Sequence, residues 1–357
     1  MLLIFQNYEK QLSDAEAWSR DLALADLAEP LGYEILSCVE HHFFDYSTSS
    51  SNIQLLSYWA ARTKRIKLLT GVVILPWNDP RRVMEQMSVL DHLSGGRALF
   101  GIGRGLARRE YDVFGIDMNE SRDRFDQSAR IILDGLESGY MEADTPLYKI
   151  PRTEIRPQPR AGFRDRLSAV AMSTDSIPSC AELGAQMVCF SQKPWAEMVP
   201  HFETYRELFL QHHGRQAPSP LIADFMVCSE SADEAEELAR TYMANTFYSV
   251  MEHYEIMGGH FKTMKGYGAY AQAAEEAAEQ LKSTALEQMA TGFADINTFG
   301  TPQQVLDRLE ARRALIGDYD YLIQPSFGGL PRSNAERSVR LFADKVMPEL
   351  RALKKAS

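Results

Sequence analysis

The sequence predicts an α/β protein whose architecture is a (β/α)8 (TIM) barrel. Short apolar runs alternate with longer segments of helical period about eight times along the chain of 357 residues. The runs are apolar throughout, which is typical of parallel strands that are buried on both faces. A doubly wound open sheet is the structural alternative, but no glycine-rich dinucleotide turn follows the first strand.

The expected elements follow one another regularly from the N-terminus. The first strand is LLIFQ (2–6), and Ser13 precedes the first helix (14–31) as a candidate N-cap. Residues 142–165 are polar and contain several prolines, so they are expected to form a connection. Further strands are expected at 33–40, 66–76, 97–103, 166–173, 185–191, 220–229 and 319–327, and further helices at 51–63, 79–93, 122–138 and 333–353.

Residues 258–300, called the insertion below, do not fit this rhythm. GGHFKTMKGYGAYAQ is rich in glycine and aromatic residues, and AAEEAAEQLKSTALEQMATG is polar and helix-forming. An extra segment of this length before the last strand favours a mobile lid over a plain connection. A surface excursion that packs against a partner subunit is the alternative. The chain as a whole (1–357) is expected to form one barrel domain that carries this lid.

Composition excludes several classes of partner. The net charge is −11 and the pI is near 5.3, which argues against nucleic acid because no surplus of cations can replace its counterions. No cluster of lysines and arginines predicts a membrane surface, and no apolar run approaches the ~18 residues of a membrane span. MLLIFQNYEK is expected to be a strand and not a signal peptide. The four cysteines show no metal spacing, so we expect reduced core residues of a cytoplasmic protein.

Polar residues at the ends of two expected strands predict an anion site. FGIGRGLARRE places Arg104 among glycines that permit close approach of a ligand, and Arg122 opens the next helix. AMSTDS places Ser173 and Ser176 at a strand-to-helix turn, where free N–H groups attract anions. Each feature alone is explained as well by a surface ion pair or a helix cap. Their placement on strand ends of one barrel predicts a phosphate site.

A pair of histidines ends the second strand, in CVEHHFFDY. Adjacent residues of a strand point to opposite faces, so His41 and His42 cannot both bind one ion unless the backbone is irregular. No other histidine or carboxylate cluster stands at a ligand spacing, so no metal is expected. An imidazole facing the barrel mouth suits general acid/base chemistry. A satisfied polar residue at the barrel rim is the alternative. The nearby aromatic residues are expected either to line an apolar pocket or to fill the core: Phe43, Phe44, Tyr46 and Trp77.

Several motifs run in order over nearly the whole chain: EHHF (40–43), ILPWNDPRRVMEQMSVLDHLSGGRALFGIGRGL (74–106), VFGIDMNESR (113–122), GYMEAD (139–144), GTPQQVLDRL (300–309) and DKVMPEL (344–350). Through them the chain resembles the bacterial luciferase-like, flavin-dependent monooxygenases. The resemblance implies a (β/α)8 barrel that binds reduced FMN (FMNH2) at the carboxyl ends of its strands. It also implies that O2 adds to the flavin C4a position. The resulting peroxide would then oxidise an organic substrate by hydroxylation or Baeyer–Villiger insertion.

The resemblance also implies roles for individual residues. His41 matches the family's active-site histidine, an acid/base group beside the flavin. Arg104 and Arg122 match arginines near the FMN phosphate. The remaining cofactor-binding positions are a cis peptide under the flavin ring at Gly71 and Val72, Leu106 at the border of the ring, phosphate-side hydroxyls at Ser173 and Ser176, and the backbone of Met172, which stands where the family has a glutamate.

Two departures from the family pattern concern the substrate. Gly103 replaces the family's reactive cysteine, which is expected to leave more room beside the flavin. The insertion shows no convincing match. Because these two regions shape the substrate pocket, the family's substrate does not transfer to this chain, and only a small, apolar organic molecule is expected.

The resemblance also bears on partners and alternatives. The chain has no NAD fingerprint, so a separate NAD(P)H:flavin reductase is expected to supply reduced FMN, and the family implies a homodimer or heterodimer. A deazaflavin-dependent hydride-transfer enzyme is one alternative, against which EHHF and GIGRGL favour FMN. A non-catalytic flavin-binding subunit is the other, and the retention of His41, Arg104 and Arg122 argues against it.

Overall fold

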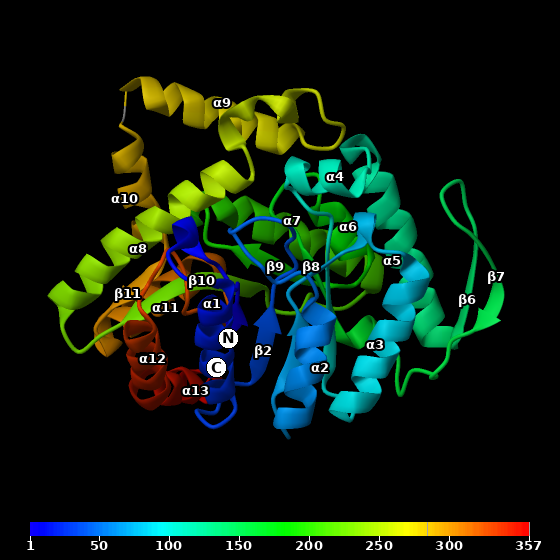
Figure 1. Ribbon diagram of the computed structural model, residues 1–357, viewed down its shortest axis with the longest axis horizontal. Helices are drawn as coiled ribbons and strands as arrows, with labels where there is room; N and C mark the ends of the chain where they lie inside the picture. The colour runs from blue at the N-terminus through cyan, green and yellow to red at the C-terminus, as the bar shows by residue number, and fades with distance from the viewer. Residues whose placement is uncertain (284, 357) are drawn as a thin grey trace.

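The computed structural model describes residues 1–283 and 285–356. A curled sheet of mainly parallel strands forms its centre, in the hydrogen-bonded order β1-β2-β3-β5-β8-β9-β10-β11, with β4 beside β5 and β12 beside β10 (Figure 1). The strands are β1 (Leu2–Leu3), β2 (Ile35–Cys38), β3 (Lys67–Thr70), β4 (Val73–Ile74), β5 (Ala98–Gly103), β6 (Tyr140–Asp144), β7 (Lys149–Glu154), β8 (Leu167–Val170), β9 (Gln186–Phe190), β10 (Leu221–Cys228), β11 (Thr298–Gly300) and β12 (Asp320–Gln324).

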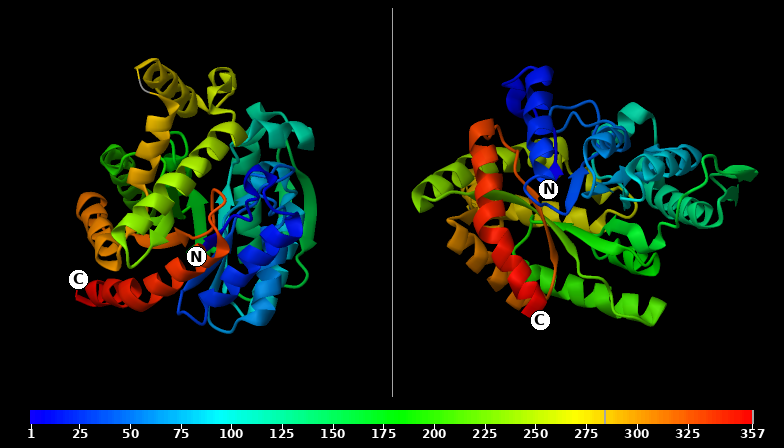
Figure 2. Two further views of the ribbon diagram at one scale, coloured as in Figure 1. Left: turned by 60° about the vertical axis from the view of Figure 1, so that its left-hand side comes forward. Right: turned by 90° about the horizontal axis from the view of Figure 1, so that it is seen from below.

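Helices surround the sheet on its outer side, as Figures 1 and 2 show from three directions. Most of them connect one parallel strand to the next. They are α1 (Asp14–Ala28), α2 (Asn52–Arg62), α3 (Pro80–Ser94), α4 (Arg108–Phe114), α5 (Ser121–Ser138), α6 (Ile177–Glu182), α7 (Trp195–His213), α8 (Ala232–His253), α9 (Gly268–Ser283), α10 (Leu286–Ile296), α11 (Pro302–Ile316), α12 (Arg332–Leu341) and α13 (Met347–Ala356).

The predicted α/β class and parallel sheet are confirmed. Ser13 caps α1 as expected: its hydroxyl accepts the Glu16 N–H at 3.3 Å, and the Glu16 carboxylate accepts the Ser13 N–H at 2.9 Å. Such a reciprocal cap satisfies two N–H groups that the first turn of a helix leaves free.

Three regions differ from the sequence-based prediction. The strand expected at 66–76 divides into β3 and β4, with a cis peptide bond at Gly71–Val72 between them. The segment expected as a plain connection contains an antiparallel hairpin, β6–β7, which projects from the body of the molecule (Figure 1). The sequence does not predict these strands because most of β7 is exposed, so it lacks the alternation of apolar and polar residues that marks a half-buried strand. The helix α4 lies where only a strand-end loop was expected.

The core is a large cluster of apolar side chains that draws on the sheet and on helices from both ends of the chain. All four cysteines are buried within it and free, as expected. Burial raises the pKa of the Cys228 thiol to about 12, so it stays protonated. Among the described residues, none of the helices combines the length and apolar composition that a membrane-spanning segment requires.

The first and last strands, β1 and β12, are joined through side-chain hydrogen bonds. No hydrogen-bonded pairing joins β1 to β12 in the described part of the chain. The buried Asp21 carboxylate of α1 bridges them instead, because it accepts the Phe5 N–H at 2.8 Å and the Ser326 hydroxyl at 2.7 Å. Arg20 Nε donates to the same carboxylate at 2.7 Å and balances its charge. Phe5 follows β1 and Ser326 follows β12, so this carboxylate fixes the first and last strands relative to each other.

The insertion lies over the carboxyl ends of the strands, on the same side of the sheet as α4 (Figure 1). Its last three residues form β11, which pairs with β10, so they belong to the sheet. Its first part is anchored on α4 and the turn after it through a second, smaller apolar cluster formed by Tyr111, Met118, Phe261 and Tyr267. Its α10 instead packs on α8 and adds Phe293 to the main core.

The Asp21 bridge can be tested by mutation. We expect Asp21→Ala to lower the free energy of unfolding by about 3–5 kcal/mol, because it leaves Arg20 buried without its partner and removes the acceptor of the Phe5 N–H. The measurement is urea-induced unfolding. Asp26→Ala on the same helix is the control, because Asp26 pairs with Arg62 at the surface and should change stability little. Equal stability of the two variants would contradict the role assigned to Asp21.

Candidate active site

A pocket lies at the carboxyl edge of the sheet, beneath the insertion. It is lined by residues that follow β2, β3, β5 and β8, at the carboxyl ends of parallel strands, where α/β proteins commonly bind ligands. The structure brings together every site residue predicted from the sequence, because all of them line this pocket: His41, Gly71, Val72, Arg104, Leu106, Arg122, Met172, Ser173 and Ser176.

One end of the pocket is cationic. Arg104 stacks its guanidinium on the Tyr267 ring at 3.9 Å from the centroid and donates to the Gly266 carbonyl at 2.6 Å. Arg122 donates to the Asp175 carbonyl at 3.1 Å. Burial, together with the neighbouring charge of Arg104, lowers the pKa of Arg122. Two like charges held this close favour an anion between them.

A pair of hydroxyls adjoins the cationic end. The hydroxyl oxygens of Ser173 and Ser176 lie 3.0 Å apart, and Ser176 Oγ accepts the Ser173 N–H at 3.0 Å. The Ser176 hydroxyl also donates to the Ser173 carbonyl at 2.9 Å. These contacts fix both side chains at the end of β8, where they add neutral donors to the arginines. The sequence analysis predicted this combination.

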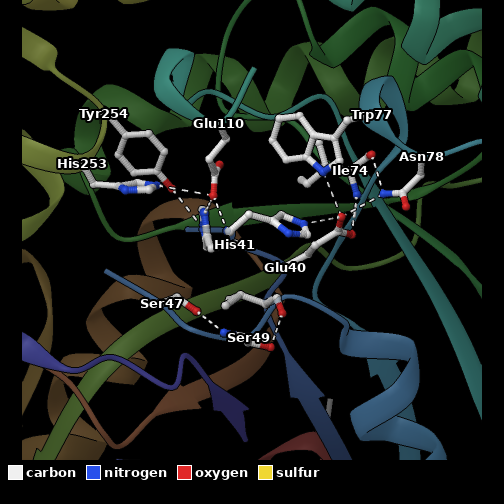
Figure 3. A network of polar contacts seen from close by, with 12 residues as sticks. Glu40, His41, Ser47, Ser49, Ile74, Trp77, Asn78, Glu110, His253 and Tyr254 are labelled. Carbon is white, nitrogen blue, oxygen red and sulfur yellow. Dashed lines mark hydrogen bonds and ion pairs between the residues drawn. The ribbon is translucent and has the colours of Figure 1, made fainter. Parts of the chain in front are cut away.

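The opposite end of the pocket holds His41. Its Nδ1 lies 3.1 Å from Oε1 of Glu110, whose side chain is only 1% exposed. The same carboxylate oxygen accepts the backbone N–H of His42 at 2.6 Å. Figure 3 shows His41, His253 and Tyr254 gathered around Glu110, with Glu40 on the other side of His41. The loop after β2 is thus bound to a side chain of α4.

This contact determines which nitrogen of His41 carries the proton. A carboxylate only accepts hydrogen bonds, so Nδ1 of His41 is the protonated nitrogen. Nε2 then keeps its lone pair, and the Tyr254 hydroxyl lies 3.5 Å from it. An imidazole held in this way by a buried carboxylate can take up a proton at Nε2, and Glu110 stabilises the imidazolium that results.

The second histidine has a different environment. His42 Nε2 lies 3.1 Å from Oε1 of Glu40, and its ring meets Phe114 edge-on. Glu40 also accepts hydrogen bonds from Trp77 Nε1 at 2.9 Å and from the Ile74 N–H at 3.0 Å. This carboxylate therefore ties the loop after β2 to the region after β4. His42 does not line the pocket, and the two imidazoles point to different carboxylates.

Aromatic residues surround the His41 end. Tyr46 and Trp77 line the pocket, whereas Phe43 is 57% exposed and Phe44 lies beneath the Arg109 guanidinium, so only two of the four aromatic residues named from the sequence belong to the pocket. Burial raises the pKa of Tyr46 to about 12, so it remains a neutral phenol. Burial is also the main reason that the pKa of His253, behind His41, falls to about 2.

The wall between the two ends is apolar, and it corrects one expectation. Gly103 was expected to leave more room beside the flavin position. A Cβ placed on Gly103 would lie 2.5 Å from Cγ2 of Val72 and 3.3 Å from Cδ1 of Ile74. The Val72 side chain, which follows the cis peptide bond, therefore already fills the space that a larger residue at 103 would use.

The insertion closes over the cationic end through specific contacts. Tyr267 donates its hydroxyl to the Gly105 carbonyl at 3.0 Å, and the backbone N–H of Lys265 donates to the Asn119 side chain at 2.9 Å. With the Arg104–Gly266 bond, these contacts place the aromatic rings of the insertion on the pocket. The insertion supplies part of the lining: Tyr267, Tyr270 and Phe293.

Sequence reasoning missed three residues of the site. Glu110 stands in ARREYDVF, where it resembles one of several surface charges, and its partner His41 is 69 positions away. His253 ends α8 and Tyr254 follows it, and both are more than 200 positions away from His41 in the sequence. No local pattern marks such residues. The one available signal was the continuation of helical character after GIGRGL, which favours an additional helix over the mouth.

Comparison with known proteins agrees with this geometry. The model of the family described as luciferase-like monooxygenase matches residues 1–319. The alkanal monooxygenase alpha chain of Photobacterium leiognathi is 25% identical over 354 residues, which cover 95% of this chain and 95% of the relative.

Two solved structures resemble the fold. The oxygenating constituent of 3,6-diketocamphane monooxygenase from Pseudomonas putida, a type II Baeyer–Villiger monooxygenase in complex with FMN, superposes with a TM-score of 0.76 at 17% identity over 98% of each chain. The coenzyme F420-dependent tetrahydromethanopterin reductase of Methanopyrus kandleri gives a TM-score of 0.64 at 17% identity, covering 92% of this chain and 94% of the other.

The packing of Val72 against Gly103 yields a prediction. We expect Gly103→Cys to lower the free energy of unfolding by about 1–3 kcal/mol, because the new side chain overlaps the Val72 methyl group. Val72→Ala should restore most of this loss in the double variant. Urea unfolding of both single variants and the double variant gives the coupling free energy. Additive effects would contradict direct contact between the two positions.

Proposed function

Because the chain belongs to the luciferase-like monooxygenase family, we propose that it is an FMN-dependent monooxygenase that uses O2 to oxidise a small, apolar organic substrate. The observation that carries this proposal is the polarity of a single pocket. Arg104 and Arg122 lie at one end, and His41, bound to Glu110, lies at the other. An apolar wall separates them.

The donor set fits FMN. The arginines and the hydroxyls of Ser173 and Ser176 would hold the phosphate, and Gly71, Val72 and Leu106 would face the ring system. Backbone groups near Met172 complete this side. When bound in its reduced form, FMN supplies the electrons that activate O2 for insertion into the substrate.

The chain's own residues would handle the proton and exclude water. Nε2 of His41 is the nitrogen that the contact with Glu110 leaves unprotonated, and the Tyr254 hydroxyl lies 3.5 Å from it. Tyr46 and Tyr254, both partly buried, line the pocket beside the His41 ring. The insertion would keep bulk water from the reacting atoms, which limits unproductive loss of reduced oxygen.

The proposal extends to the architecture and the partners. The curled sheet is proposed to be a (β/α)8 barrel that forms one domain (1–357), with the insertion (258–300), apart from β11 at its end, as a lid. A separate NAD(P)H:flavin reductase would supply reduced FMN, and the chain would act as a homodimer or heterodimer in the cytoplasm. The apolar lining formed by Trp77, Phe125 and Phe293 supports a substrate with little polarity. Hydroxylation and Baeyer–Villiger insertion are both compatible with it.

A second candidate is hydride transfer from a deazaflavin on the same fold. It is favoured by the structural similarity to the coenzyme F420-dependent reductase. The two cofactors can be separated by measuring the binding of each to the purified chain. Tight binding of the deazaflavin alone would favour this candidate over FMN.

The phosphate assignment predicts a selective loss of affinity. We expect Arg104→Met and Arg122→Met each to weaken FMN binding by about tenfold or more, since a charge-assisted hydrogen bond contributes about 1.5–3 kcal/mol. Binding of riboflavin, which has no phosphate, should change little. Isothermal titration calorimetry with both flavins makes the comparison.

The control for this prediction is Arg124→Met. Arg124 is on the same helix as Arg122 but pairs with Glu120 and does not line the pocket. It should bind both flavins like the wild type. An equal loss of FMN and riboflavin affinity in the Arg104 and Arg122 variants would argue against a phosphate at this end.

The catalytic assignment is tested with reduced FMN, O2, and a panel of aldehydes and cyclic ketones. We expect His41→Ala to lower the rate of product formation by about 10²–10⁴-fold, the usual contribution of a general acid or base. Glu110→Gln should cause a smaller loss because it removes the charge that stabilises the imidazolium but keeps an acceptor. Flavin binding should persist in both variants. An unchanged oxidation rate in His41→Ala would contradict the catalytic role of His41, whereas absence of oxidation by the wild type would favour a non-catalytic flavin-binding subunit.

A further inference from the structure

His253, the last residue of α8, is a buried histidine with no hydrogen-bond partner. It is 2% exposed, and neither ring nitrogen has a partner within hydrogen-bond distance. Its ring stacks on Tyr46 with centroids 4.3 Å apart and meets the His41 ring edge-on at 5.0 Å. A buried imidazole without a partner costs free energy, so its position calls for a ligand that the side chains do not supply.

The Glu110 carboxylate lies close to the ring of His253. Nε2 of His253 lies 3.9 Å from Oε1 of Glu110, a distance too long for a hydrogen bond. His41 Nδ1 lies 3.1 Å from the same oxygen. The two imidazoles thus approach one carboxylate from different elements, the loop after β2 and the end of α8, as Figure 3 shows.

These three side chains have the separations of a metal-binding group. One ligand atom from each of His41, Glu110 and His253 lies within 4.8 Å of the other two. In a tetrahedral zinc site with bonds of about 2.0–2.1 Å, neighbouring ligand atoms are about 3.4 Å apart, so small side-chain adjustments would close the shell. Two imidazoles and one carboxylate are a donor set that zinc uses in enzymes.

The surroundings suit a site with one open position. The Glu110 carboxylate is oriented by the His42 N–H at 2.6 Å, as ligating carboxylates commonly are by a second partner. His41 and Glu110 line the pocket and His253 does not. The three side chains would bind an ion at the wall of the pocket, and the fourth coordination position of the ion would be open to the pocket.

We propose that His41, Glu110 and His253 bind a divalent transition-metal ion, with Zn²⁺ the best match, and that the bound ion inhibits the oxidation reaction. No metal was expected from the sequence, because no further ligand stands at a suitable spacing from the His41–His42 pair. The fold supplies two more ligands. His42, which faces Glu40, takes no part.

The inhibition follows from the tautomer of His41 and rests on the proposed function. An ion bound at Nδ1 displaces the proton that this nitrogen shares with Glu110. In the neutral ring that proton then resides on Nε2, whose lone pair is lost. His41 could no longer accept a proton on the pocket side, and Glu110 would be occupied by the ion.

Metal binding is tested on the full chain without a histidine tag, treated with chelator and titrated with ZnCl₂ by calorimetry in the absence of flavin. We expect one site on the wild type. His253→Phe keeps a ring against Tyr46 but removes the ligand, so zinc should bind more than about 100-fold more weakly. His201→Phe on α7 is the control: His201 Nδ1 is also unpartnered, yet His201 is not part of the ligand group, so binding should not change. Absence of zinc binding to the wild type, or equal binding by His253→Phe, would overturn the site.

A second measurement does not depend on the variants folding. In the wild type, the ¹⁵N signals of the ring nitrogens of His41 and His253 should shift together on addition of Zn²⁺, while those of His42 and His201 should not. A shift confined to other histidines would overturn the site. Because both binding measurements omit flavin and substrate, they stand or fall independently of the proposed function.

Inhibition is measured separately, as the rate of substrate oxidation with reduced FMN and O2 at increasing Zn²⁺. Zinc should inhibit the wild type over the concentration range in which it binds, and the chelator should restore the rate. Unchanged oxidation with zinc bound would overturn the inhibition.

Discussion

The buried carboxylate of Glu110 binds two successive residues of the loop after β2. It lies 3.1 Å from Nδ1 of His41 and accepts the backbone N–H of His42 at 2.6 Å. Glu110 comes from α4, the short helix after β5, and is buried. This one group therefore fixes the loop after β2 relative to the loop after β5. Glu40, which belongs to this loop, accepts hydrogen bonds from Trp77 and Ile74. Two buried carboxylates, one from α4 and one from the loop itself, therefore fix the position of the loop.

This arrangement separates two kinds of chemistry within one pocket. The end near Glu110 carries His41, and the other end carries the positive charges of Arg104 and Arg122. The insertion covers the arginine end, because Gly266 accepts a hydrogen bond from Arg104 and the Tyr267 ring stacks on its guanidinium. A ligand with an anionic tail and a flat apolar head matches both ends at once.

Local signals were enough to predict the sheet and the cationic end. Apolar runs mark strands such as β5 and β10, and an arginine among glycines at 101–105 indicates a strand mouth. The family resemblance then supplied roles for His41 and for Gly71–Val72, which line the pocket. The hairpin β6–β7 was missed because its exposed residues lack the alternation of a half-buried strand.

The polar partners could not be predicted, for a physical reason. Glu110 and His253 belong to the site only because the fold brings them into contact with His41, which is far from both in the sequence. In addition, a charged residue in a helix is usually at the surface, so Glu110 does not stand out. The space beside Gly103 is a similar case. The residue alone indicates room, whereas the neighbouring Val72 side chain shows that the room is filled.

We propose that one ligand, FMN, reaches both ends of this pocket. A crystal structure of the protein with FMN tests this proposal. We expect the phosphate within hydrogen-bond distance of Arg104 and Arg122, and the ring against Gly71–Val72 on the side of His41. A phosphate bound away from the arginines, or a ring outside the space between Val72 and His41, would contradict it.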